Sequence, residues 1–278
     1  IEDRQSPNDP SSAWTAAADQ WLDHLAESLP GLYYLDASQH FLLMAPDRGP
    51  GAPRLLPAAE RCRTTILHIL VEVGAFDLPG KLPILVFDNA ESYYQYVAYY
   101  HPEGEYGSSA GMQIRNGYPH IALIDAEFRL LEKTLAHELT HVALAEKDQP
   151  LWIEEGLAQM IDRNCSGEPV LQLTTDRARR HRKFWRNHGL DQFWSGDGFH
   201  KASPAQTFSY ELAEVLLTLL IADHQPTWFG LSRSRQRQLI NFLNQAHIED
   251  GGNAAAIECL SQTLPELAAK FLGPQEDG

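Results

Sequence analysis

Two histidines and a glutamate stand together in the segment His137-Glu138-Leu139-Thr140-His141. Residues four apart lie on one face of an α-helix, so both imidazoles can reach a single Zn²⁺ ion. Glu138 is then placed to take a proton from a water molecule on the metal. The flanking apolar residues keep helical spacing, and no Pro or Gly interrupts them. The alternative is a pair of structural histidines on an ordinary helix.

A zinc ion held by two histidines needs a third protein ligand and one position left open for water. The segment Trp152-Ile153-Glu154-Glu155-Gly156-Leu157-Ala158 begins eleven residues after His141 and carries two carboxylates. We expect it to form the next helix. Successive helical residues point about 100° apart, so only one of Glu154 and Glu155 can face the metal.

The combination of HELTH with W-x-x-E-G-L-A resembles the gluzincin metallopeptidases, and most closely the compact bacterial members called peptidase MA-like. In that pattern the glutamate directly before the glycine is the third ligand, which implies Glu155 here and leaves Glu154 as the rival. The resemblance covers roughly residues 39–272. It implies a thermolysin-like core, a bound Zn²⁺ and hydrolysis of peptide bonds.

The resemblance implies roles for two further residues. The family often places a tyrosine at the start of a helix and aims it at the metal, which here implies Tyr210 as a hydrogen-bond donor to the oxyanion of the reaction. Anchoring of that helix to the core is the alternative. Many members carry an aspartate four residues after the third ligand, where this chain has Gln159. A glutamine can accept a hydrogen bond from an imidazole but lacks the charge of a carboxylate.

The edge strand of the expected sheet bears on the mode of cleavage. Aminopeptidases of this clan carry G-x-M-E-N there, and its glutamate binds the amine of the substrate. The equivalent segment here is Gly111-Met112-Gln113, in which Gln113 is neutral. We therefore expect an endopeptidase rather than an aminopeptidase. An extended substrate would pair with the strand predicted at Met112–Arg115, at the edge of the cleft.

Hydrophobic periodicity places strands in the first half of the chain and helices mainly in the second. Strands are predicted at Leu32–Asp36, His40–Ala45, Leu82–Phe87, Met112–Arg115 and His120–Asp125. Helices are predicted at Ala13–Ser28, Leu55–Ala75, Asn89–Tyr100, Phe128–Glu146, Trp152–Asn164, Thr175–His188, Thr207–His224, Ser234–Ile248 and Ala254–Leu264, with a further helix at the C-terminal end. The fold class is therefore α+β, a small mixed or antiparallel sheet lobe followed by a mainly helical lobe. Residues 1–38 form a tail and a helix, and residues 39–273 form a single catalytic domain.

Turn-forming residues set the ends of several of these elements. Pro46 is expected to stand outside the strand before it, because proline cannot donate to a strand ladder. Asn116-Gly117 predicts a tight hairpin turn. A small-residue loop is expected at Gly107–Gly111.

Charge and composition exclude other classes of function. The 278 residues include 22 Lys and Arg against 37 Asp and Glu, a net charge of −15. Such a chain repels phosphate backbones, so nucleic acid is not expected as the main partner. The longest apolar run, around Val215–Ala222, is broken by Thr218, and we expect no membrane span. Cys62, Cys165 and Cys259 lack metal-ligand spacing and are expected as core thiols, with one disulfide as the alternative.

A short basic segment stands out against this acidic background. It contains six of the 22 basic residues: Arg177, Arg179, Arg180, Arg182, Lys183 and Arg186. We interpret it as a solvated helix face. Binding of an anionic substrate or of nucleic acid is the alternative. His200 precedes Tyr210 in a loop bounded by Gly, Ser and Pro and is a further, less favoured candidate for approach to the site.

These residues together predict a zinc-dependent peptidase acting on peptides or proteins, with Zn²⁺ on His137, His141 and Glu155 and with Glu138 as the base. Two alternatives stay open. One is an inactive scaffold that keeps the fold, and the other is a zinc hydrolase of a non-peptide amide or ester. The sequence leaves the substrate and the oligomeric state open. For the compartment, it favours the periplasm or secretion slightly over the cytoplasm.

Overall fold

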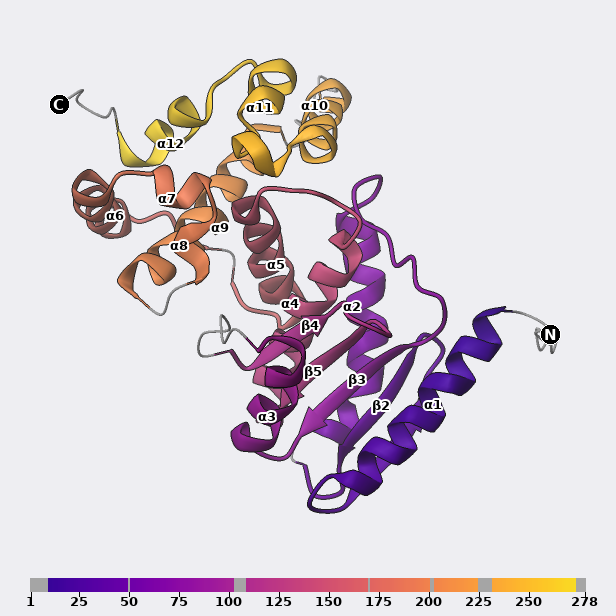
Figure 1. Ribbon diagram of the computed structural model, residues 1–278. Coiled ribbons are helices and arrows are strands. Elements are labelled where there is room, and N and C mark those ends of the chain that lie inside the picture. Colours follow the sequence, from indigo (N-terminus) through magenta and orange to yellow (C-terminus); the bar gives the residue numbers. More distant parts are fainter. Residues whose placement is uncertain are drawn as a thin grey trace. The chain divides into compact units, whose positions relative to one another are not determined.

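A computed structural model describes residues 10–49, 51–102, 109–169, 171–200, 203–224 and 232–273. It confirms the α+β class: a mixed sheet of five strands comes first, and a mainly helical part follows it (Figure 1). The chain forms two compact units. The first comprises Ile1–Leu70, Gly74–Ala143 and Cys165–Gly167, and the second comprises Val71–Val73, Leu144–Asn164 and Glu168–Gly278.

The sheet of the first unit has the strand order β1-β2-β3-β5-β4. Its strands are β1 (Tyr33–Ala37), β2 (Phe41–Pro46), β3 (Leu82–Phe87), β4 (Gly111–Ile114) and β5 (His120–Ile124). The three inner strands β2, β3 and β5 run parallel, and the two edge strands β1 and β4 pair antiparallel with their neighbours. The inner strands are almost wholly apolar and buried, as expected for strands covered on both faces. Strand β4 is an edge strand, as the sequence predicts for this segment.

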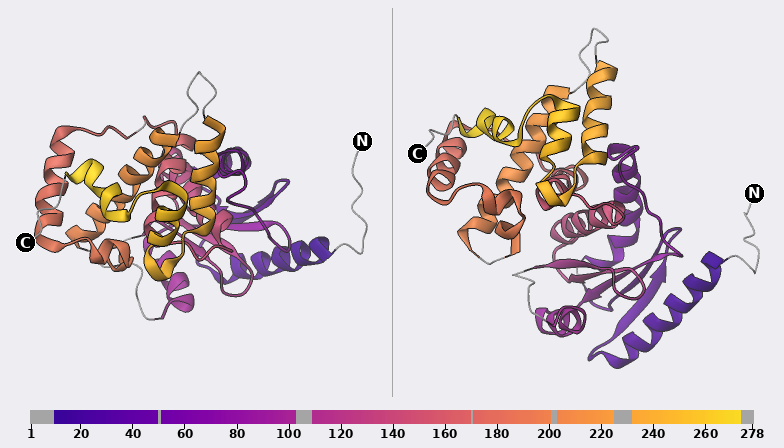
Figure 2. Two further views of the ribbon diagram at one scale, coloured as in Figure 1. Left: turned by 90° about the horizontal axis from the view of Figure 1, so that it is seen from above. Right: turned by 45° about the horizontal axis from the view of Figure 1, so that its top comes forward.

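Helices cover both faces of this sheet (Figure 2). Helices α1 (Pro10–Ser28) and α3 (Ala90–Tyr100) enclose one core with alternate residues of the strands, among them Leu42, Met44, Leu85 and Phe87. The intervening residues of the strands face the opposite side, because neighbouring side chains on a strand point to opposite faces. Helices α2 (Leu55–Ile69) and α4 (Phe128–Leu144) lie on that side. The α4 helix therefore rests on a rigid, buried support.

The second unit consists of helices. They are α5 (Leu151–Cys165), α6 (Thr175–His188), α7 (Asp191–Trp194), α8 (Asp197–His200), α9 (Pro204–His224), α10 (Ser232–Gln245), α11 (Asn253–Leu260) and α12 (Leu264–Leu272). Two short 3₁₀ turns, η1 (Ala52–Arg54) in the first unit and η2 (Ile248–Asp250) in the second, complete the structure. The Trp152 ring of α5 lies against Phe193, Trp194 and Phe242, and its Nε1 donates to the Gly251 carbonyl at 2.9 Å. These contacts fix the first turn of α5 within the unit.

Helix α9 is long and apolar enough, by length and composition, to cross a membrane: Pro204–Asp223 has a mean hydropathy of 1.2. Within the described residues 44% of that window is buried. The core helix of a soluble protein passes the same test, and Leu212, Leu216 and Leu220 of α9 are all fully buried. The absence of a membrane span stays a prediction.

Two strand predictions need correction at their ends. Pro46 is the last residue of β2, opposite Tyr33 of β1, and not a residue outside the strand. The pairing of β2 with β3 covers only Phe41–Met44, so no ladder bond on that side needs an N–H from Pro46. The strand predicted at Met112–Arg115 ends at Ile114, so the hairpin connection spans residues 115–119, and Gly117 supplies a φ of 78° within it.

Several helix predictions run too long, and those at Phe128–Glu146 and Ser234–Ile248 end at Leu144 and Gln245. Helix α2 ends at Ile69 and not at residue 75, because the chain turns away through Leu70 and through Glu72, which has a φ of 66°. The helix predicted at Ala254–Leu264 ends at Leu260, where Ser261 takes a left-handed conformation. A new helix begins at Leu264, capped by Thr263 and Glu266. Residues 107 and 108 of the loop predicted at 107–111, and the first nine residues of the predicted tail, lie outside the described residues.

Candidate metal centre

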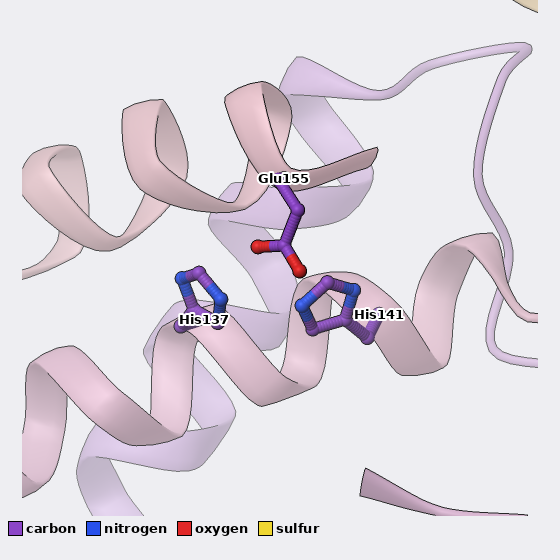
Figure 3. Close-up of side chains that lie close together, drawn as sticks. All are labelled: His137, His141 and Glu155. Carbon is purple, nitrogen blue, oxygen red and sulfur yellow. The ribbon is translucent and has the colours of Figure 1, made fainter. Parts of the chain in front are cut away.

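Three side chains could hold one metal ion: His137, His141 and Glu155. The nitrogen or oxygen atoms that they offer all lie within 4.8 Å of one another. Both histidines come from α4, and their ring centroids are 4.9 Å apart. The carboxylate of Glu155, from α5, points toward both rings (Figure 3). The adjacent Glu154 is not a member of this group.

The local sequence of α4 explains why both imidazoles share a face. Leu131, Leu135 and Leu139 repeat at intervals of four residues and are at most 1% exposed, so they fix the rotation of the helix on its apolar support. His137 and His141 have the same interval of four but a different phase. The phase of the leucines therefore determines the direction in which the two histidines point.

Glu138 lies against the edge strand of the sheet. The backbone N–H of Gln113 in β4 donates to Glu138 Oε2 at 2.8 Å, and the glutamate is 7% exposed. An N–H donor at this distance holds a carboxylate oxygen in a fixed orientation. The residue type of Gln113 indicates only a neutral side chain, and a contact made by its backbone N–H leaves no trace in the sequence.

Gly111 allows β4 to approach α4 this closely. A Cβ atom at position 111 would lie 2.5 Å from Thr134 Cγ2, 2.8 Å from Leu123 Cδ2 and 3.2 Å from Glu138 Cγ. Any side chain there would push the strand and the helix apart. The start of β4 is also held by α3, whose Tyr94 hydroxyl donates to the Ser109 carbonyl at 3.1 Å. Edge strand and glutamate are thus positioned together.

Within the second unit, Tyr210 of α9 lies beside Glu155. Its hydroxyl donates to Glu155 Oε1 at 3.4 Å, a long hydrogen bond. The Gln159 side chain donates to the Tyr210 carbonyl at 2.8 Å and so ties α5 to the first turns of α9. The sequence shows only that Gln159 could accept a bond from a ligand imidazole, whereas in the structure its amide nitrogen supports the backbone of Tyr210. A glutamine can play this part because it carries donors, which a carboxylate lacks.

Gly156, next to Glu155, brings α5 against α9. A Cβ at this position would lie 2.8 Å from the Ala213 carbonyl oxygen and 2.8 Å from Leu217 Cδ1. The glycine after the glutamate therefore has a packing role, and it brings Glu155 near Tyr210. A mid-helix glycine following a candidate ligand was the available sequence signal for this close approach.

His200 ends the short helix α8 on the surface and is not part of the metal group. The basic segment forms α6, as predicted, and its buried face consists of His181 and Trp185. Most of its cations are exposed: Arg179, Arg180, Arg182, Lys183 and Arg186. Arg177 is half-buried and lies 3.7 Å from a carboxylate oxygen of Glu211. None of the three cysteines forms a disulfide within the described residues, and Cys62 and Cys259 are buried.

No family model and no curated protein sequence matches this chain. The donor set itself indicates which metals fit. Two imidazoles and one carboxylate suit Zn²⁺ with an open position, whereas Ca²⁺ and Mg²⁺ prefer oxygen ligands throughout. The same donors can also hold Fe²⁺.

Proposed function

We propose that the protein is a zinc-dependent peptidase of the gluzincin type that cleaves within peptide chains. The observation that carries the proposal is the convergence of His137, His141 and Glu155 on one point, with Glu138 in the same helical turn as His137. The family resemblance of HELTH and W-x-x-E-G-L-A supports it. When bound, the metal would supply Lewis-acid activation of water and of the scissile carbonyl.

Glu138 is the residue that moves the proton in this proposal. Its carboxylate accepts a proton from the attacking water and delivers it to the leaving amine. The Gln113 N–H occupies one side of Oε2 and thereby orients the other oxygen and lone pairs. A base held in this way needs no reorientation at the moment of reaction.

Strand β4 is the proposed binding edge for the substrate backbone. Among the described strands it pairs with β5 alone, and an extended peptide can add to such an edge through main-chain hydrogen bonds. This mode of binding holds the middle of a chain and requires no free terminus. Gln113 offers no charge for a substrate amine, which supports cleavage within chains rather than at the amino end.

Tyr210 supports the same reaction from α9. Its hydroxyl lies at Glu155, so it can donate a hydrogen bond to negative charge that develops on the substrate oxygen. It can instead hold Glu155 in place for the metal. The two roles predict different effects of removing the hydroxyl.

The test is cleavage of a mixed library of peptides blocked at both ends, followed by mass spectrometry. We expect internal cleavage by the zinc-loaded protein and a loss of about 10²–10⁴-fold in Glu138→Gln, with zinc retained. Glu146→Gln, an exposed residue just after the same helix, is the matched control and keeps full activity. An active Glu138→Gln variant would contradict the mechanism.

The two alternatives give other results in the same assay. A scaffold, with or without the metal, would cleave neither peptides nor small esters and amides. A hydrolase of another substrate class would leave the library intact and turn over members of an ester and amide panel, with the same dependence on Glu138.

A further inference from the structure

The first unit contains a cavity that none of the three metal-ligand residues lines. Its volume is about 620 Å³, and its walls come from α1, the β1–β2 turn, α2 and the segment before β3. Sites for small molecules commonly enclose about 300–1,000 Å³ and combine apolar walls with a few convergent polar groups. This cavity has a volume in that range, and both polar and apolar groups of one compact unit line it.

Two cations line the cavity and are held in place. The Lys81 ammonium donates to the Ser38 carbonyl at 2.6 Å, which uses one of its three donors. The Arg63 guanidinium lies 5.2 Å from the centroid of the Phe76 ring. Among the described residues Arg63 makes no ion pair, so its N–H groups remain available to an anion. Both cations are half-buried, which strengthens their attraction for a ligand.

Among the charged residues that line the cavity, cations outnumber acids. The His40 Nδ1 atom lies 2.7 Å from Glu60 Oε2, and Glu60 also accepts from the Ser38 hydroxyl. Burial raises the pKa of Glu60, and its hydrogen bonds to Ser38 and His40 outweigh burial and lower it, so this carboxylate stays ionised beside the cavity. Asp19 is exposed and is the acid that lines the cavity. Arg63 and Lys81 therefore exceed it by one charge, in a chain whose net charge is −15.

Hydroxyl and apolar groups complete the walls. Thr15 Oγ1 accepts the Lys81 backbone N–H at 3.1 Å, which leaves its hydroxyl hydrogen to donate to another group. Gly80 makes this close approach possible, because a Cβ there would lie 2.8 Å from Thr15 Oγ1. Phe76 and Leu78 supply apolar surface beside the cations.

We propose that this cavity binds a small organic anion. A carboxylate or phosphate group lies at Arg63 and Lys81, and an apolar body packs against Phe76 and Leu78. Arginine recognises both head groups through paired N–H donors. The site is separate from the metal chemistry, and it remains whether or not the protein is a peptidase.

The test is calorimetric titration with three probes: 4-phenylbutyrate, phenyl phosphate and the neutral 4-phenylbutanol. We expect at least one anion to bind with a Kd below about 1 mM, and the alcohol to bind at least about tenfold more weakly. The stronger of the two anions identifies the head group. Failure of both anions to bind at about 10 mM contradicts the proposal.

Variants locate the binding. Arg63→Gln weakens it by about 10–100-fold, the loss expected for a hydrogen bond to a charged group. Arg129→Gln removes the same charge from an exposed position that does not line the cavity, and it leaves the affinity unchanged. Leu78→Trp fills the cavity and blocks binding even if Arg63→Gln fails to fold. Equal affinity in wild type and Leu78→Trp would overturn the assignment.

An anion could also bind a metal ion, so the titration is repeated with His137→Ala. We expect unchanged affinity there, since His137 does not line the cavity. Binding that disappears in His137→Ala and survives in Leu78→Trp would place the anion at the metal centre and contradict the proposed cavity site, without touching the proposed function.

Discussion

Helices α4 and α6 both carry titratable residues at helical spacing, and the structure uses them differently. The two histidines of α4 share a face and are joined by a carboxylate within 4.8 Å. The cations of α6 lie mostly on its exposed side, and its buried side is formed by His181 and Trp185. The histidine pair of α4 therefore belongs to a candidate metal centre, whereas the longer run of charged residues on α6 forms an exposed helix face.

The difference follows from the chemistry of the side chains. Neutral imidazoles can approach one another, and a cation with three suitable donors stabilises their convergence. Guanidinium groups are always charged and repel, so a helix holding several of them exposes them to water. Spacing on a helix predicts that two side chains share a face. Such a face can become a metal site when another element of the fold contributes a further donor.

The strongest test of the difference between α4 and α6 removes the carboxylate that α5 contributes to the metal group. Glu155→Gln is expected to lower zinc affinity by at least about 100-fold, since it removes a charged ligand of the metal. Glu154→Gln removes the same charge one residue away and is expected to bind zinc normally. Titration of zinc against a competing chelator measures both. A larger loss in Glu154→Gln would mean that the rival glutamate is the ligand.

Tyr210→Phe tests the support that α9 gives to Glu155. If the hydroxyl donates to the reaction, cleavage falls by about 10²-fold or more while zinc affinity is kept. If it positions Glu155, zinc affinity falls and turnover of the loaded protein changes little. Tyr99→Phe, at a residue 82% exposed, is the control and changes neither quantity. An unchanged Tyr210→Phe variant would leave anchoring of the helix as its role.

A smaller effect is expected from the buried histidine of α6. Burial lowers the pKa of His181, and the nearby Arg177 and Arg180 act in the same direction, while Glu211 opposes them. The folded-state pKa therefore lies below the unfolded value of about 6.5. The stability that the buried, neutral His181 contributes is present above about pH 6.5. It is lost as the pH falls through the lower pKa of the folded state.

Thermal unfolding between pH 7.5 and pH 5 measures this loss. We expect the melting temperature of the wild type to fall more steeply than that of His181→Gln. His188→Gln, an exposed histidine of the same helix, should follow the wild type. Parallel curves for wild type and His181→Gln would contradict a structural role for the buried imidazole.

The smallest effect is expected on the exposed face of α6. We replace both Arg182 and Lys183 by glutamine in one variant. The free energy of unfolding should change by no more than about 0.5 kcal/mol for each replaced residue, as for ordinary surface positions. Peptide cleavage should not change. A selective fall in cleavage would show that this face binds substrate and would remove the contrast with α4.

The sequence predicted the parts of the fold that depend on periodicity. The strand Leu82–Phe87 and the helix Thr175–His188 have the predicted bounds, because a buried apolar run and a capped amphipathic segment are local signals. The ends of α2 and α11 were wrong, since residues such as Glu72 and Ser261 adopt positive φ only under tertiary contacts. Short helices α7 and α8 carry too few residues for a periodic signal.

For the candidate site, residue types indicated the histidines and a nearby carboxylate. They did not reveal the hydrogen bond from Gln113 to Glu138 or the role of Gln159 beneath Tyr210, because both depend on backbone groups of distant segments. The close contacts at Gly111 and Gly156 were also not predictable. The sequence shows that these positions lack a side chain, but it does not show which atoms pack against them.

Metal content tests the central claim most directly. Mass spectrometry would be run in parallel on the wild type, on His137→Ala and on His188→Ala, the matched exposed histidine of α6. We predict about one zinc ion per chain in the wild type and in His188→Ala, and its loss in His137→Ala. Absence of zinc from the reconstituted wild type, or equal zinc in all three proteins, would contradict the zinc centre.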